Sequence, residues 1–265
     1  MNNNVKKWML LAVGIIVTAV GIALDAYTYI QGDYKNTNYA YALLVTFVGA
    51  LILFTAISGL VKSKKSGADA GSMAKVDITT LAQAALCAAL CYIGFAFFKI
   101  DIPVGTEKTA FHFGNVFCVI AALLIGGYWG GLAGAVGMTI GDLTTAYVTS
   151  APKTFVLKLC IGLIVGVVAH KAFKLSKPHS AKYTAVATIV SAAAGMAFNI
   201  VADPLVGYFY KMYLYGIPQD MSKTLAKIST VTTSVNAVIA VAAASVIYLA
   251  LRPVMKKAGL LKELS

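Results

Sequence analysis

The chain has 265 residues, of which 59% are hydrophobic and only 12% are charged, and its mean hydropathy is +0.80. Soluble globular domains carry about 25% charged residues, so this composition argues against a soluble fold and favours an all-α integral membrane protein. The net charge of +12 is typical of nucleic-acid binding, but here the lysines form short clusters between apolar runs, which is the pattern of topology signals.

Eight apolar runs are predicted to be transmembrane helices, because about 20 apolar residues are needed to cross a bilayer. In chain order they lie near 8–29, 40–61, 79–98, 113–128, 131–148, 154–172, 183–208 and 226–251. The first run is longer than the apolar part of a signal peptide and no clear cleavage site follows it, so we expect a retained anchor. The run 113–128 is short and flanked by glycine, which favours a tight hairpin with the next span.

The lysine clusters predict the orientation, because loops on the cytoplasmic side of a membrane are enriched in Lys and Arg. With both termini in the cytoplasm, most basic residues fall inside: Lys6, Lys7, Lys62, Lys64, Lys65, Lys75, Lys171, Lys174, Lys177, Lys182, Arg252, Lys256, Lys257 and Lys262. The opposite topology would place each of these clusters outside. We therefore expect a multi-pass protein of the cell membrane with both ends inside.

A polar segment divides the chain. Residues 62–78 are rich in Lys, Ser, Gly and Ala, a composition typical of a flexible linker. The sequence predicts a two-helix membrane unit at 1–61, a cytoplasmic linker at 62–78 and a six-helix membrane unit at 79–265.

Small residues recur at helical spacing in two of the predicted spans. The segment 127–141 contains the pairs Gly127 and Gly131, Gly130 and Gly134, and Gly137 and Gly141, which predict close packing against neighbouring helices. The span that starts near residue 79 carries a second set of small residues at the same spacing: Ala84, Ala85, Ala88 and Ala89. For this set two interpretations stay open, internal packing and docking of another membrane protein.

Asp142 and Lys158 are the ionisable residues of the spans that most require an explanation. A charge at a helix centre costs roughly 2.5–3.5 kcal/mol on insertion scales, so each should meet a partner, a cavity or the membrane interface. Both lie near the predicted outer ends of their helices. One interpretation is snorkelling or a mutual ion pair; the other is that both line a ligand pocket.

Other polar side chains fall where they would line the same outward-facing cavity. Thr154 lies four residues before Lys158, and Asn199 four residues before Asp203, so each pair shares a helix face. Asn236 interrupts an apolar helix, and the polar segment after the third span brings His112 and Asn115 to a helix entrance.

The sequence lacks the motifs that would make the chain an enzyme or an ATPase. It contains no G-x-x-x-x-G-K-[ST] loop, no H-E-x-x-H and no G-x-S-x-G. Its four cysteines lie inside apolar runs without paired spacing: Cys87, Cys91, Cys118 and Cys160. We expect no catalytic centre, no bound metal and no cofactor.

One ordered set of motifs is similar to a known family. H-F-G-N at 112–115 is followed by GGYWGGLAGAVGMTIGDL at 126–143, then by Tyr147, Ala151-Pro152, Thr154-Phe155 and Lys158. This order resembles the substrate-binding S component of energy-coupling factor (ECF) vitamin transporters, in the riboflavin-type group. The resemblance covers roughly residues 79–251, and the two N-terminal spans are a departure from it.

The resemblance implies a six-helix protein that binds a vitamin or vitamin precursor near its outer face, under a lid formed by residues 99–112. It implies that His112, Asn115, Asp142, Tyr147, Thr154 and Lys158 lie in or near the pocket. It also implies a membrane coupling protein, docked on the alanine face, and two cytoplasmic ATPases. The implied ligands are vitamin B6 compounds or a thiamine pyrimidine precursor, ahead of riboflavin and cobalamin.

Two other functional classes stay open on the residues alone. A stand-alone secondary transporter would use Asp142, Lys158 and Asp203 as a proton or sodium relay, and it would take up solute without ATP. A membrane-embedded enzyme or a scaffold is disfavoured because the sequence offers no obvious cluster of His, Asp and Glu.

Overall fold

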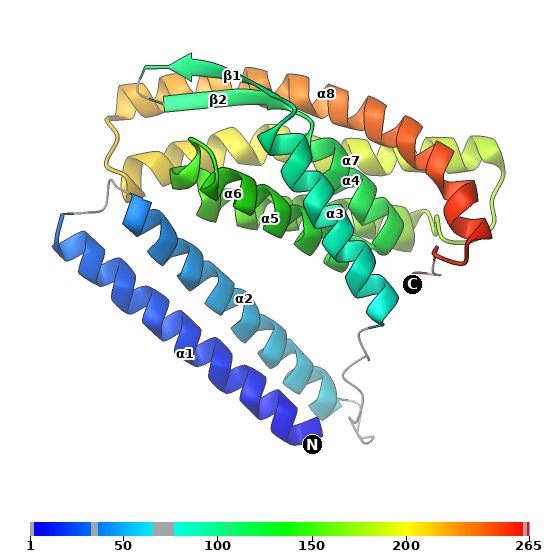
Figure 1. Ribbon diagram of the computed structural model, residues 1–265, viewed down its shortest axis with the longest axis horizontal. Helices are drawn as coiled ribbons and strands as arrows, with labels where there is room; N and C mark the ends of the chain where they lie inside the picture. The colour runs from blue at the N-terminus through cyan, green and yellow to red at the C-terminus, as the bar shows by residue number, and fades with distance from the viewer. Residues whose placement is uncertain (1–2, 33–36, 66–76, 106, 262–263, 265) are drawn as a thin grey trace. The chain divides into compact units, whose positions relative to one another are not determined.

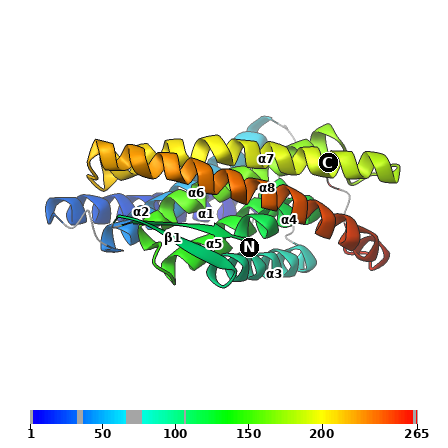
Figure 2. The ribbon, with the colours of Figure 1, turned by 90° about the horizontal axis from the view of Figure 1, so that it is seen from above.

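A computed structural model describes residues 3–32, 37–65, 77–105, 107–261 and 264. The described residues form eight α-helices and one two-stranded hairpin (Figures 1 and 2). Contacts divide the chain into two compact units, Met1–Asp77 and Ile78–Ser265, and each is described by itself.

The N-terminal unit is a pair of long apolar helices, α1 (Asn3–Ile30) and α2 (Thr37–Lys65). Glycines bring the two backbones together, since a Cβ added at Gly14 would lie 2.8 Å from the Cα of Leu53, and one added at Gly49 would overlap Thr18. α2 continues to Lys65, so the start of the expected linker at residue 62 is helical. Residues 66–76 of that linker lie outside the described part of the chain.

The second unit contains six helices, α3 to α8, of which two end in a short π-helical turn: Val167–Ala172 extends α6, and Tyr210–Leu214 extends α7. A single 3-10 turn, Val148–Ser150, precedes α6. The helices are α3 (Ile78–Ala96), α4 (Gly114–Ile125), α5 (Gly127–Leu143), α6 (Ala151–Gly166), α7 (Ala181–Phe209) and α8 (Gln219–Lys257).

Two of the eight expected spans are shorter than a full crossing of the bilayer. Six described helices are long and apolar enough to cross a membrane: α1, α2, α3, α6, α7 and α8. α4 has 12 residues and α5 has 17, so at 1.5 Å per residue they reach about 18 and 25 Å against a hydrocarbon core of about 30 Å. The two meet at Gly126, whose φ of 84° suits glycine, so the predicted tight hairpin is confirmed.

The segment between α3 and α4 forms a β-hairpin, which the sequence analysis did not predict. β1 (Lys99–Val104) pairs antiparallel with β2 (Glu107–His112), from the Lys99 and His112 pair to the Val104 and Glu107 pair. Gly105, at φ 61°, occupies the turn. In Figure 1 the hairpin runs alongside α8, and side chains of α8 bond to β2.

α5 packs against three helices through its glycines, as the sequence predicted. A Cβ added at Gly137 would overlap the carbonyl of Ala88 on α3, and one added at Gly130 would overlap Ala122 on α4. Against α6 the contact is glycine to glycine, because a Cβ on Gly162 would overlap the Cα of Gly131. The absence of side chains on both helices lets the backbones touch.

The four alanines of α3 separate into two pairs. Ala84 is buried at 7% exposure, and the carbonyl of Ala88 faces Gly137 of α5. Both contribute to internal packing, with Ala88 half-buried. Ala85 and Ala89 are exposed, and docking on this face stays a prediction.

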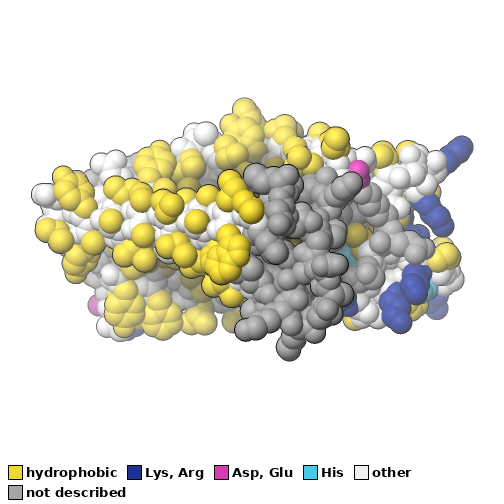
Figure 3. Space-filling view, turned by 90° about the horizontal axis from the view of Figure 1, so that it is seen from below, with side chains coloured by type: hydrophobic (Ala, Val, Ile, Leu, Met, Phe, Trp, Pro, Cys, Tyr) yellow, Lys and Arg dark blue, Asp and Glu magenta, His cyan; other side chains and the backbone are white. Residues whose placement is uncertain are grey.

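The two ends of the second unit differ in charge. Around the end of α6, the start of α7 and the end of α8 lie seven basic residues: Lys171, Lys174, Lys177, Lys182, Arg252, Lys256 and Lys257. Figure 3 shows Lys and Arg side chains gathered at one end of the view. By the positive-inside rule, an end of a membrane protein that is rich in Lys and Arg is expected on the cytoplasmic side.

We predict that Gly162→Val destabilises the second unit by about 1–3 kcal/mol or more, because the new side chain has no room against the backbone of α5. Leu163→Val, at the neighbouring exposed position, is the matched control and should change stability little. Thermal unfolding of the purified protein in detergent measures both. Equal stability of the two variants would contradict the close contact between α5 and α6.

Candidate functional site

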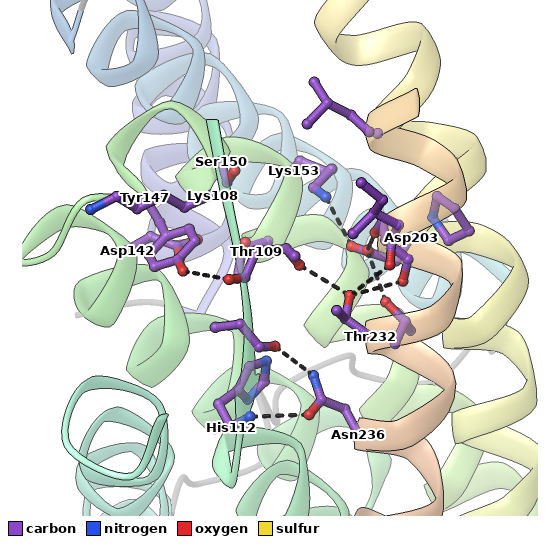
Figure 4. A pocket seen from close by; sticks show the side chains of 18 of the residues that line it. Lys108, Thr109, His112, Asp142, Tyr147, Ser150, Lys153, Asp203, Thr232 and Asn236 are labelled. Carbon is purple, nitrogen blue, oxygen red and sulfur yellow. Dashed lines mark hydrogen bonds and ion pairs between the residues drawn. The ribbon is translucent and has the colours of Figure 1, made fainter. Parts of the chain in front are cut away.

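A cavity lies within the second unit, between the β-hairpin and helices α3 to α8 (Figure 4). Its volume is about 120 Å³, measured as the space open to the centres of water molecules. At 10–15 Å³ per water by this measure, the cavity has room for roughly ten waters or a ligand with a similar number of non-hydrogen atoms. A single small organic molecule fits such a space.

The cavity brings together every side chain that the sequence analysis proposed for substrate binding. The nine residues lie far apart in the sequence, yet all of them line the same space: His112, Asn115, Asp142, Tyr147, Thr154, Lys158, Asn199, Asp203 and Asn236. Asn115 and Asn199 are 1% exposed and Asp142 is 2% exposed. Their common location is a finding, whereas their role in binding stays a prediction.

One carboxylate of the cavity is fully engaged by the protein itself. Asp203 accepts a hydrogen bond from Lys153 Nζ at 2.9 Å through one oxygen. Its other oxygen accepts from Ser229 Oγ at 2.7 Å and Thr233 Oγ1 at 3.2 Å. This cluster joins α6, α7 and α8 at one wall of the cavity (Figure 4).

Asp142 and Lys158 do not form the mutual ion pair that was one of their two interpretations. Among the described residues, the ion pairs within the second unit involve other side chains. Lys158 is 6% exposed, so its side chain does not snorkel to an open surface either. Both residues line the cavity, which leaves the pocket interpretation in place.

Several polar atoms of the lining have no protein partner. Among the described residues these include Asp142 Oδ2, Asn115 Oδ1, Asn199 Oδ1 and His112 Nδ1. An unpaired buried polar atom costs about 1–3 kcal/mol. Four such atoms in one cavity indicate a place where a polar ligand or ordered water completes the hydrogen bonds.

Aromatic rings form the wall of the cavity beneath the hairpin. Phe95 of α3 contacts the His112 ring edge to face at a centroid distance of 4.9 Å, and it contacts Tyr147 at 5.6 Å. All three rings line the cavity. The wall offers a flat ligand a surface for aromatic contact beside the polar groups.

Specific bonds hold the hairpin over the cavity. Tyr147 donates its hydroxyl to Asp101 Oδ1 at 2.9 Å and is also within 3.1 Å of the carbonyl oxygen of Thr109. Asn236 accepts from the backbone N–H of His112 and donates to the carbonyl of Ala110, both at 3.0 Å. Asn236 therefore holds two points of β2 to α8.

An ion pair fastens the other end of the hairpin. Lys211, in the π-helical extension of α7, lies with its Nζ 2.6 Å from Glu107 Oε2 at the start of β2. Thr109 of β2 also shares a hydrogen bond of 3.0 Å with Thr232 of α8. These contacts place the segment 99–112 as a cover of the cavity; its motion as a lid stays a prediction.

Sequence reasoning missed part of the lining. It did not single out Lys153 and Lys211, which pair with the acidic groups, or the hydroxyl residues of α8. A signal for the latter exists in the run Ser229, Thr230, Thr232, Thr233 and Ser234, which interrupts an apolar helix. No local signal identifies the partner of either lysine, because both carboxylates are distant in sequence.

His112 and Tyr147 lie outside the helical spans, and burial shifts the pKa of each. Burial lowers the pKa of the His112 imidazole to about 3; the charges of Lys158 and Lys99 act in the same direction and Asp203 opposes them. Burial, with the hydrogen bond to Asp101, raises the pKa of the Tyr147 phenol above its usual range. Both groups are therefore neutral at physiological pH, and each serves as an uncharged hydrogen-bonding group.

Comparison with protein families decides the assignment. The sequence model of the ECF-type riboflavin transporter S component family matches residues 75–253, about two thirds of the chain. The chain belongs to this family. Its six-helix unit is thus an ECF S component, and the family is one of transporter subunits rather than of enzymes. Comparison with curated proteins found no match, and comparison with solved structures found none either.

Membership of the family fixes the coarse function. The protein is a multi-pass membrane protein and the substrate-binding subunit of an ECF transporter, a system that takes a small-molecule substrate and includes a membrane coupling protein and ATPases. The S-component match begins at residue 75, so α1 and α2 lie outside it.

The low pKa of His112 predicts acid sensitivity. Its pKa falls from 6.5 to about 3 on folding, so the unfolded chain binds the proton more readily between these values and stability decreases as pH falls below 6.5. Between pH 7 and pH 5 we expect a loss of about 1–2 kcal/mol from this residue, since one pKa unit corresponds to about 1.4 kcal/mol. Thermal unfolding in detergent at both pH values measures it.

His112→Gln keeps a polar side chain but does not titrate, so its stability should fall less between pH 7 and pH 5. His179→Gln, at an exposed position, is the control and should behave like the unmodified protein. A His112→Gln variant with the full acid sensitivity would contradict the burial of a neutral imidazole.

Proposed function

We propose that this S component captures a small heteroaromatic vitamin or vitamin precursor from the outer side of the cell membrane. The observation that carries the proposal is the cavity, in which charged and amide groups without protein partners face an aromatic wall. Such a combination of apolar surface and a few placed polar groups is typical of small-molecule sites.

Within this class we favour a vitamin B6 compound or a pyrimidine precursor of thiamine over riboflavin or cobalamin. The cavity volume of about 120 Å³ supports this order, because a single-ring vitamin fits it better than a fused tricyclic ring with a ribityl chain or a corrinoid. Asn115, Asp142, Thr154, Lys158 and Asn199 are the residues proposed to contact the ligand. His112, Tyr147 and Asn236 are proposed to contact it and to hold the hairpin.

For uptake we propose that this chain docks on a membrane coupling protein driven by two cytoplasmic ATPases. The exposed alanines of α3, Ala85 and Ala89, form the proposed contact, since small residues let helix backbones approach closely in lipid. The basic residues at one end of the second unit support an orientation with both termini in the cytoplasm.

Ligand retention tests the binding function. Protein purified in detergent after growth in rich medium should release one vitamin-like molecule per chain, measured by mass spectrometry of the extracted small molecules. Asn199→Leu should release none, because an apolar side chain would project into the cavity at a position now 1% exposed. Val201→Leu, on the exposed face of the same helix, is the control and should retain the molecule.

Release of the same molecule by Asn199→Leu and by the unmodified protein would place the ligand elsewhere. Uptake by the chain alone in vesicles without ATP would contradict the ECF mechanism and favour a secondary transporter.

Docking is tested by a pair of leucines on α3. Ala85→Leu with Ala89→Leu should leave ligand retention unchanged but reduce uptake at least tenfold in cells that carry the coupling protein and ATPases, because the bulk separates the two helix backbones. Ala193→Leu with Ala197→Leu, an exposed pair with the same spacing on α7, is the control and should keep uptake. Loss of retention together with uptake would assign Ala85 and Ala89 to internal packing.

A further inference from the structure

The charges that line the cavity can be sorted into those that the protein neutralises and those that it does not. Lys153 is paired with Asp203 at 2.9 Å, and Lys211 is paired with Glu107 at 2.6 Å. Lys108, a third lysine of the lining, is exposed to solvent. Two pairs are therefore complete without a ligand.

One positive and one negative group stay without a counter-charge. Asp142 is 2% exposed and its Oδ2 has no hydrogen-bond partner, while Lys158 is 6% exposed and has no ion pair with a described residue. Burial of an uncompensated charge costs several kcal/mol. The two lie in the same cavity but beyond ion-pair distance of each other, so a molecule between them can compensate both.

The other unpartnered groups of the same cavity are neutral. Asn115 and Asn199 each present an amide with an oxygen that has no partner, and His112 presents an unpartnered ring nitrogen. Amides both donate and accept hydrogen bonds, so they suit hydroxyl or amino substituents on a ring rather than a further charge.

We propose that the ligand binds as a net-neutral zwitterion, with an anionic oxygen at the ammonium of Lys158 and a cationic N–H at the carboxylate of Asp142. This assignment rests on the proposed function and narrows its substrate class to dipolar heteroaromatic molecules, such as a hydroxypyridine with a protonated ring nitrogen. A phosphate ester is disfavoured, because the remaining buried lysines of the lining are already paired with carboxylates.

The proposal predicts an order of affinity among matched probes. Pyridoxine is dipolar at neutral pH; its 3-O-methyl ether keeps the ring but loses the anionic oxygen and, because a 3-alkoxypyridine nitrogen is unprotonated at pH 7, the cationic N–H as well; its 5′-phosphate adds a dianion. By isothermal titration calorimetry with the purified full chain at pH 7, we expect pyridoxine to bind at least tenfold more tightly than either analogue. Equal or tighter binding of an analogue, or no binding of pyridoxine, would overturn the proposal.

A variant tests the contact at Lys158 separately from the fold. Lys158→Met should weaken pyridoxine binding at least thirtyfold, because it leaves the anionic oxygen buried without a counter-charge. It should also reduce the preference for pyridoxine over the uncharged ether, a change that a merely structural role of Lys158 would not produce. Lys223→Met, at an exposed lysine outside the cavity, is the control and should keep both affinity and preference.

The same logic applies to Asp142→Asn, which should weaken pyridoxine at least tenfold and also reduce the preference over the ether, because the ether carries no cationic N–H. A preference that survives undiminished in either variant would overturn the charge assignment. Failure of the charge assignment is distinct from failure of the binding function: recovery of an anionic or non-ionisable vitamin from the purified protein would overturn the former and support the latter.

Discussion

The low dielectric of the membrane interior governs this structure, because a charge or polar group enclosed there has no bulk water to bind. Where the protein supplies a partner, the bond connects separate helices. Asp203 of α7 connects α6 and α8 in this way, through an ion pair and two hydrogen bonds. Where a buried polar atom has no protein partner, as at Asp142 Oδ2, the fold carries the cost of its desolvation. The cost of burying a polar group therefore explains two features of the cavity. Some of its polar groups are paired across helices, and others keep free hydrogen-bonding capacity.

Close helix packing makes that arrangement possible. Gly131 and Gly162 allow α5 and α6 to touch along their backbones, and these are the two helices that carry Asp142 and Lys158. Van der Waals contact and small residues stabilise helix pairs in lipid, where hydrophobic burial gives little net drive. The position of the unpaired charges therefore depends on residues that never contact a ligand.

The hairpin joins the cavity to the segments that connect the helices. Its contacts come from three separate elements, with Asn236 on α8, Lys211 after α7 and Tyr147 before α6. Ala110 of β2 adds buried apolar packing against Phe95, Met138 and Tyr147. The hairpin thus covers a cavity whose other walls are closely packed helices. Such an arrangement is compatible with a subunit that binds a substrate.

The sequence by itself determined the membrane class, the helix-rich fold, the tight turn at Gly126 and the polar residues of the cavity. These features can be read from short segments of sequence, because a polar or charged group inside a membrane has a high free-energy cost unless it has a partner. It did not determine that α4 is only 12 residues long, that residues 99–112 pair as strands, or that Ala84 and Ala88 face inward. Nor could it show that Lys153, rather than Lys158, pairs with Asp203. Those features depend on contacts between segments distant in sequence, which only the packed helices bring within reach of one another.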